Sequence, residues 1–173
     1  TGATGTDALE RALSAVLDHR LARRERHEVT AARMATRLVR WLSLTHESPA
    51  TLGESLQQQV DDGGWVDRAV AAVWTGSAYP AVVAAYRRLA ERVLRQRGER
   101  DRRAAQQLAT ATAVGENPTG VVPVERVLAD VVRPLSERVP ILLLVLDGMS
   151  TGVATAIAQD ATESGWTELL PDG

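Results

Sequence analysis

The most constraining feature of the sequence is a run of six aliphatic residues, Ile141–Leu146, which begins after Pro140 and ends at Asp147-Gly148. The run has neither the 3.6-residue period of an amphipathic helix nor the alternation of a half-buried strand. A short, continuous apolar segment between a proline and a glycine is typical of a strand buried on both faces. The chain is therefore expected to change architecture near residue 139.

The residues before this run predict a bundle of six to eight helices over residues 1–138. Apolar residues recur there at helical spacing, as in Leu9–Leu21 and Val29–Leu42. Between these two stripes, a turn at Arg23–Glu28 is favoured over a continuous helix. Helix starts are predicted from a capping pair and from prolines, at Asp7/Glu10, Ser48-Pro49, Pro80 and Pro123.

Glycines and a proline predict where these helices end. The pair Gly63-Gly64 is expected to end the helix that starts at Ser48-Pro49, and Gly98 is expected to break the helix that starts at Pro80. The segment Gly115–Gly120 has the composition of a loop. Arg133-Pro134 is expected to end or kink the helix that starts at Pro123.

After the aliphatic run, Thr151–Ser164 predicts a helix, and Leu169-Leu170 is a candidate for a further short strand. A strand, a loop and a helix in this order form the opening unit of a doubly wound sheet. The expected fold is therefore mainly α: a multi-helix domain over residues 1–138, then the first β-α unit of an α/β core over residues 139–173. The rest of that core is absent from the sequence, which predicts a truncated domain.

The composition excludes several kinds of chemistry. The 173 residues include no cysteine, which excludes disulfides, thiol nucleophiles and cysteine-ligated zinc. All twenty basic residues are arginine, so a phosphate-binding loop lysine and a Schiff-base lysine are excluded too. The net charge of −2 does not favour an anionic partner. No apolar run reaches the ~20 residues that span a bilayer, so a cytoplasmic protein without a membrane partner is expected.

Asp147 is the candidate functional residue, since ligands in open α/β sheets bind beyond the carboxyl ends of the strands. A carboxylate there can ligate a metal cation, and Gly148 lets the backbone turn closely around it. The alternative is that Asp147 caps the following helix.

Three enzyme classes place an aspartate after an aliphatic strand. A nucleoside-triphosphatase strand requires the missing lysine, and a haloacid-dehalogenase site requires an aspartate where Val145 stands. The sequence suits the alkaline phosphatase superfamily best, in which aliphatic residues followed by Asp-Gly supply the first metal ligand.

Most of the chain resembles the part of a PglZ protein that leads into its PglZ domain, with the type 2 BREX form closest. The resemblance rests mainly on "ILLLVLDGMS". The helical segments and the last nine residues that also carry it are "AARMATRLVRWL" (Ala31–Leu42), "DDGGWVDRAV" (Asp61–Val70), "VERVLADVVRPL" (Val124–Leu135) and "GWTELLPDG" (Gly165–Gly173).

This resemblance implies a hydrolase of the alkaline phosphatase superfamily that acts in bacteriophage resistance (Pgl/BREX antiviral defence) with other defence proteins as partners. It implies a metal-dependent phosphatase whose divalent metal is zinc, with Asp147 as the first metal-binding aspartate. The nucleophile and the other ligands would lie beyond Gly173, so the chain contains no catalytic residue and, as a fragment, is expected to be inactive and metal-free. The alternative is a non-enzymatic helical interaction scaffold of a defence complex.

The remaining candidates are interpreted as structural. Ser150 and Thr151 are read as helix-cap residues, the three histidines as surface residues, and the four tryptophans as packing residues. Arg87–Arg103 holds eight arginines and is read as a solvated or partner-pairing face, with nucleic acid as a less favoured ligand. The unpartnered strand predicts a homo-oligomer, anomalous packing on the helices, or poor order.

Overall fold

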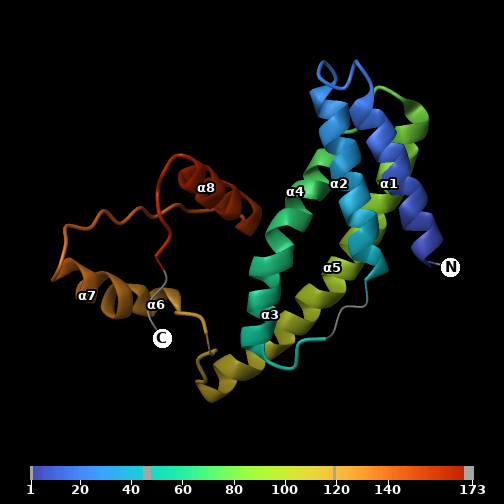
Figure 1. Cartoon of the computed structure of the whole chain (residues 1–173). Coiled ribbons are helices and arrows are strands. Elements are labelled where there is room, and N and C mark those ends of the chain that lie inside the picture. Colours follow the sequence, from blue (N-terminus) through green and yellow to red (C-terminus); the bar gives the residue numbers. More distant parts are fainter. Residues whose placement is uncertain (1, 45–47, 119, 170–173) are drawn as a thin grey trace.

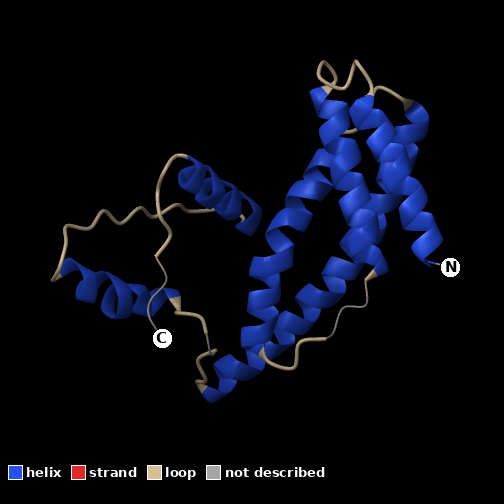
Figure 2. Ribbon diagram, viewed as in Figure 1, coloured by secondary structure: helices blue, strands red, loops and turns tan. Residues whose placement is uncertain are grey.

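The computed structural model describes residues 2–44, 48–118 and 120–169. Helices α1 (Gly2–Asp18), α2 (Arg26–Ser43), α4 (Gly64–Trp74) and α5 (Pro80–Val114) form a bundle in which α2 contacts the other three (Figure 1). The described residues contain no strand (Figure 2). The mainly helical fold class is thus confirmed, whereas the predicted β-α unit is not observed.

The core of the bundle lies where α2, α4 and α5 meet. Each helix buries residues that share one face at helical spacing, which is the pattern of an amphipathic helix that packs against its neighbours. The core cluster consists of Leu38, Trp41, Val66, Ala69, Val73, Ala90 and Val93. These side chains are mostly small, which lets the three helices approach closely.

The first two helices are separated by a turn, as the sequence predicts, but its bounds differ. The turn covers residues 19–25, and α2 already begins at Arg26. The predicted start at Asp7 is wrong, because α1 begins at Gly2 and Asp7 lies inside it. On the bundle's surface, Arg40 of α2 pairs with Glu10 of α1 at 3.2 Å.

A continuous helical stretch runs through Gly63-Gly64, where the sequence predicts an end. It consists of α3 (Leu52–Gln58), a π-helical turn η1 (Gln59–Gly63) and α4. A capping box starts it, because the Glu54 amide donates to the Thr51 hydroxyl and the Thr51 amide to the Glu54 carboxylate. The N-cap of this stretch is therefore Thr51, and the predicted start at Ser48-Pro49 lies too early in the chain.

The two glycines serve close packing instead of termination. Both have helical backbone angles, and both are buried. Helix α8 (Thr151–Glu163) lies so near that a Cβ atom on Gly152 would be 3.0 Å from the Gly64 carbonyl oxygen. A helix–helix contact therefore explains Gly64 better than a C-cap does, whereas a Cβ atom on Gly63 would meet the Gln59 side chain of the same helical stretch.

Helix α5 also continues through a glycine, Gly98, so the predicted break is wrong. A glycine inside a helix costs about 1 kcal/mol relative to alanine. The neighbouring turns offset that cost, because Arg97 and Arg100 reach Asp67 and Asp62 on the adjacent helical stretch. The helix ends at Gly115, whose φ of 66° is left-handed, and the predicted loop is confirmed for residues 115–118 and 120.

A smaller helical stretch follows the loop. It contains α6 (Val124–Val127), a π-helical turn η2 (Leu128–Val132) and α7 (Arg133–Ser136). The predicted start after Pro123 is confirmed, and the irregular turn directly before Arg133-Pro134 accommodates the proline within the stretch. Among the described helices, α6, η2 and α7 contact only one another, and they stand apart from the bundle (Figure 1).

The aliphatic run Ile141–Leu146 is an extended loop with no strand beside it in the described chain (Figure 2). A strand requires a neighbour for its backbone hydrogen bonds, and none is provided here. All six side chains are exposed, with Leu142 at 82% and Val145 at 81%. The predicted helix after it is confirmed as α8. Leu169 is not in a strand, and Leu170 lies outside the described residues.

Candidate functional site

Asp147 is exposed at the end of the aliphatic run, where it helps to close a tight turn. Its Oδ1 atom accepts a hydrogen bond of 2.8 Å from the Gly148 amide. Gly148 has a φ of 68°, which a residue with a side chain rarely adopts. The carboxylate and the glycine therefore form a compact, solvent-facing corner between the run and α8.

The cap of α8 is Ser150, not Asp147. The Val153 amide donates to the Ser150 hydroxyl at 3.3 Å, and Thr151 is the first helical residue. The prediction that Ser150 is a cap residue is confirmed. Helix capping, the alternative explanation for Asp147, does not hold in this structure.

The residues around Asp147 do not form a metal site in the described part of the chain. No three histidine, aspartate or glutamate side chains come together there as ligands, whereas a catalytic zinc takes about three protein ligands. His19 and His27 are exposed, as expected for surface residues, and His46 lies outside the described residues. A metal role for Asp147 stays a prediction.

The tryptophans divide between the core and the surface. Trp41 is buried in the bundle, which confirms its packing role, and Trp65 is half-buried beneath the Arg37 guanidinium at 4.6 Å. Trp74 and Trp166 are 63% and 74% exposed, so the packing prediction is wrong for both. The period of the helices did not indicate this, because Trp74 is the last residue of α4 and Trp166 lies in the loop beyond α8.

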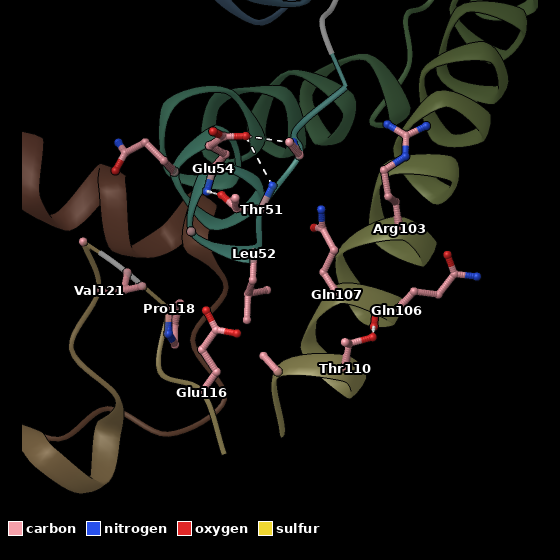
Figure 3. A pocket seen from close by; sticks show the side chains of 15 residues that line it. Thr51, Leu52, Glu54, Arg103, Gln106, Gln107, Thr110, Glu116, Pro118 and Val121 are labelled. Atoms are coloured by element: carbon pink, nitrogen blue, oxygen red, sulfur yellow. Dashed lines mark hydrogen bonds between the residues drawn. The ribbon is translucent and has the colours of Figure 1, made fainter. Parts of the chain in front are cut away.

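The largest hollow, of about 800 Å³, lies between α3, the last turns of α5 and the loop after α5 (Figure 3). Glu54 and Thr51 are occupied by the capping box. Gln107 is occupied as well, since it bonds Ser55 and the Pro49 carbonyl oxygen. These polar groups are used structurally, and the described residues that line the hollow show no nucleophile placed beside a free base.

The arginines of α5 fall into two groups, which the sequence did not separate. Arg97 and Arg100 point into the bundle, with side chains 13% exposed, and are partnered by carboxylates. The six others are exposed, which fits the predicted solvated or partner-pairing face; they are Arg87, Arg88, Arg92, Arg95, Arg102 and Arg103. Four further arginines are exposed on the turn between α1 and α2 and at the start of α2: Arg20, Arg23, Arg24 and Arg26.

Arg100 is the most constrained of these groups. Its guanidinium lies 4.6 Å above the Trp41 ring and 3.5 Å from the Asp62 carboxylate. Burial lowers the pKa of Arg100, and Asp62 acts in the opposite direction. Trp41 also donates its ring N–H to Asp62 at 3.2 Å, so the carboxylate serves both side chains.

Comparisons of the chain with protein-family models, curated proteins and solved structures found no match. The described helices include none that is both long and apolar enough to cross a bilayer.

Proposed function

We propose that this chain is the helical region and opening strand of a PglZ-type metal-dependent phosphohydrolase of a bacteriophage-resistance system. Asp147 is the first ligand of its zinc site, and polypeptide outside these residues supplies the other ligands and the nucleophile. The observation that carries the proposal is the exposed aliphatic run that ends at an exposed, non-capping carboxylate.

The exposure of this run favours a sheet as its partner. Burying one large aliphatic side chain contributes about 1.5–3 kcal/mol, and six such side chains are left exposed at Ile141–Leu146. Their backbone N–H and C=O groups also lack the hydrogen bonds that a neighbouring strand would provide, since the described residues contain no strand. Insertion between the layers of an α/β core would satisfy both the side chains and the backbone.

The fixed position of α8 favours a role for the bundle in presenting this segment. Helix α8 packs on α4 through Gly64 and Gly152, so the loop between α7 and α8 is anchored at its far end. In the proposed enzyme, the bundle holds the strand–loop–helix unit in place while the sheet forms on it.

The residues near Asp147 suit a metal ligand. The carboxylate is a hard oxygen donor, and Gly148 has no side chain to hinder a close approach. A bound zinc would polarise the phosphoryl group and activate a hydroxyl nucleophile. Asp147 would contribute one negative charge to that site.

An interaction scaffold within a defence complex is the second candidate. The observation that favours it is the amount of exposed apolar surface on residues 121–169, beyond the run itself. Val124, Leu128, Trp166 and Leu169 are all exposed there, and exposed apolar surface in excess of single scattered residues is typical of protein contacts.

The substitution Asp147→Asn separates the two functions when made in a protein that contains the complete proposed hydrolase core. We expect zinc content and hydrolysis of a generic phosphate ester to fall by orders of magnitude, because one charged ligand is lost with almost no change in shape. The matched control is Asp160→Asn, which removes the charge of an exposed carboxylate that lies on α8, outside the proposed site. Full activity of Asp147→Asn would contradict the metal-ligand role of Asp147, whereas absence of zinc and of hydrolysis in the unchanged protein would contradict the enzyme proposal and leave the scaffold.

A further inference from the structure

A second hollow, of about 430 Å³, lies beside the middle of α5 and is rich in arginine. It is formed by the end of α2, the segment before α3, α3 itself and α5. Its lining residues are Leu42, Leu44, Ser48, Gln58, Arg92, Arg95, Gln96, Glu99, Arg100 and Arg103. The volume falls within the range of small-molecule sites.

The charges of this hollow are not balanced. Four guanidinium groups line it, against one lining carboxylate, Glu99, and the nearby Asp62 that pairs with Arg100. Arg103 donates to the hydroxyl of Ser48 at 2.8 Å, which leaves its charge uncompensated. Arg92 and Arg95 have no ion pair within the described ranges. Among the described residues that line the hollow, positive charge is therefore in excess.

The arginines form a row along one face of α5. Arg92, Arg95, Glu99 and Arg103 follow the three- and four-residue spacing of a helix face, so Glu99 lies between the second and third of these arginines, with Arg100 beside them. At 1.5 Å per residue, the row extends over about 16 Å. This length exceeds what one phosphate needs and leaves room for a chain of several charged groups.

Arg100 provides a fixed charge at the inner side of the row. Its side chain is 13% exposed, and Trp41 and Asp62 hold the guanidinium in place. Its Nη2 atom makes no hydrogen bond in the described structure. The charges of Arg97 and Arg103 add to the effect of burial in lowering its pKa. An anion in the hollow would offset this repulsion.

We propose that this hollow binds the phosphate chain of a small ligand, such as inorganic tripolyphosphate or a nucleoside triphosphate. Guanidinium groups bind phosphate oxygens through paired, charge-assisted hydrogen bonds, and this site presents them in series. The neutral side chains of Ser48, Gln58 and Gln96 offer further polar contacts. None of the described lining residues is aromatic, so they offer no stacking surface of the kind that single-stranded nucleic acid uses.

The test is calorimetric titration of the chain with tripolyphosphate, ATP, AMP and a single-stranded oligonucleotide. We expect saturable binding of tripolyphosphate and ATP with similar affinity, and binding of AMP at least tenfold weaker. The double substitution Arg92→Gln/Arg95→Gln should weaken tripolyphosphate binding at least tenfold. Both side chains are exposed and lack ion pairs among the described residues, so the fold should be retained, as circular dichroism would verify.

The matched control is Arg87→Gln/Arg102→Gln, which removes the same charge from two exposed positions of α5 outside this hollow. Its affinity for tripolyphosphate should stay within twofold of the unchanged chain. Three results would overturn the proposal: absence of saturable tripolyphosphate binding, equal losses in both double variants, or tighter binding of the oligonucleotide than of tripolyphosphate. The last result would assign the arginines to nucleic acid.

Discussion

At the scale of single residues, Glu28 connects α2 to the turn between α4 and α5. Its carboxylate accepts a hydrogen bond of 2.9 Å from the Ala78 amide. This bond, and a second from the Ser77 side chain, lower the pKa of Glu28 below its ordinary value of 4.5. The contact joins segments fifty residues apart and has no counterpart in the sequence pattern.

We predict that Glu28 makes the bundle sensitive to acid. Because its pKa is lowered in the folded state, its stabilising effect is present above the unfolded-state pKa and is lost as the pH falls through the folded-state pKa. Glu28→Gln should destabilise the chain by at most about 1 kcal/mol at pH 7, since solvent screens the contact. Urea unfolding at pH 7, 5 and 3 should show the two proteins converging at the lowest pH.

Glu25→Gln is the control for this prediction, since Glu25 is exposed in the preceding turn and makes no side-chain cap. It should match the unchanged chain at each pH. A constant difference between Glu28→Gln and the unchanged chain across all three pH values would disprove the titration argument.

Among the substitutions of charged residues considered, Asp62→Asn is expected to lower the stability of the fold most. It pairs with the constrained Arg100 and accepts the Trp41 ring N–H. Asp62→Asn keeps an acceptor for Trp41 but leaves Arg100 without its opposite charge, which should cost about 1–3 kcal/mol. The measurement is urea unfolding followed by tryptophan fluorescence.

Asp101→Asn is the comparison for Asp62→Asn. The Asp101 side chain is 61% exposed and lies 4.0 Å from Arg97, so its loss should cost less than about 0.5 kcal/mol. Equal effects of the two substitutions would mean that burial of Arg100 has no energetic consequence.

At the scale of elements, two helical glycines have opposite roles. A Cβ atom at Gly98 would meet nothing within 4 Å, whereas one at Gly152 would lie 3.0 Å from a backbone oxygen of α4. We expect Gly98→Ala to stabilise the chain by about 0.5–1 kcal/mol, because alanine favours the helix. Gly152→Ala should destabilise the α4–α8 contact by about 1–3 kcal/mol through overpacking. Thermal unfolding of both variants tests this pair, and a stabilised Gly152→Ala would refute the close contact.

The exposed run Ile141–Leu146 should cause the chain to associate. An unpaired, apolar extended segment offers backbone and side chains to a second copy. Leu142→Lys should reduce the associated fraction in sedimentation velocity without lowering helix stability, because Leu142 is already 82% exposed. Val124→Lys provides a control, since Val124 is 84% exposed on α6. A strict monomer in the unchanged chain, or equal effects of both substitutions, would contradict pairing through the run.

At the scale of the whole molecule, the sequence predicted the architecture better than the boundaries. The mainly helical character of the described residues before Glu137 and the α8 helix follow from apolar spacing, which is a local property. The starts at Pro80 and after Pro123, and the end at Gly115, also follow from local backbone chemistry. Gly63-Gly64 and Gly98 misled the prediction because their surroundings, and not their own conformational preferences, decide whether the helix continues.

At the candidate site, too, some features follow from the sequence and others only from the tertiary structure. The sequence by itself determined that Asp147 and Gly148 form a corner after an aliphatic run and that a capped helix follows, since each depends on neighbouring residues. The tertiary structure alone decided which arginines of α5 are buried, which tryptophans are exposed, and that the run has no partner in the described chain. These properties depend on contacts between distant segments, such as Arg100 with Asp62 and Gly64 with Gly152, and a periodic pattern contains no information about which faces meet.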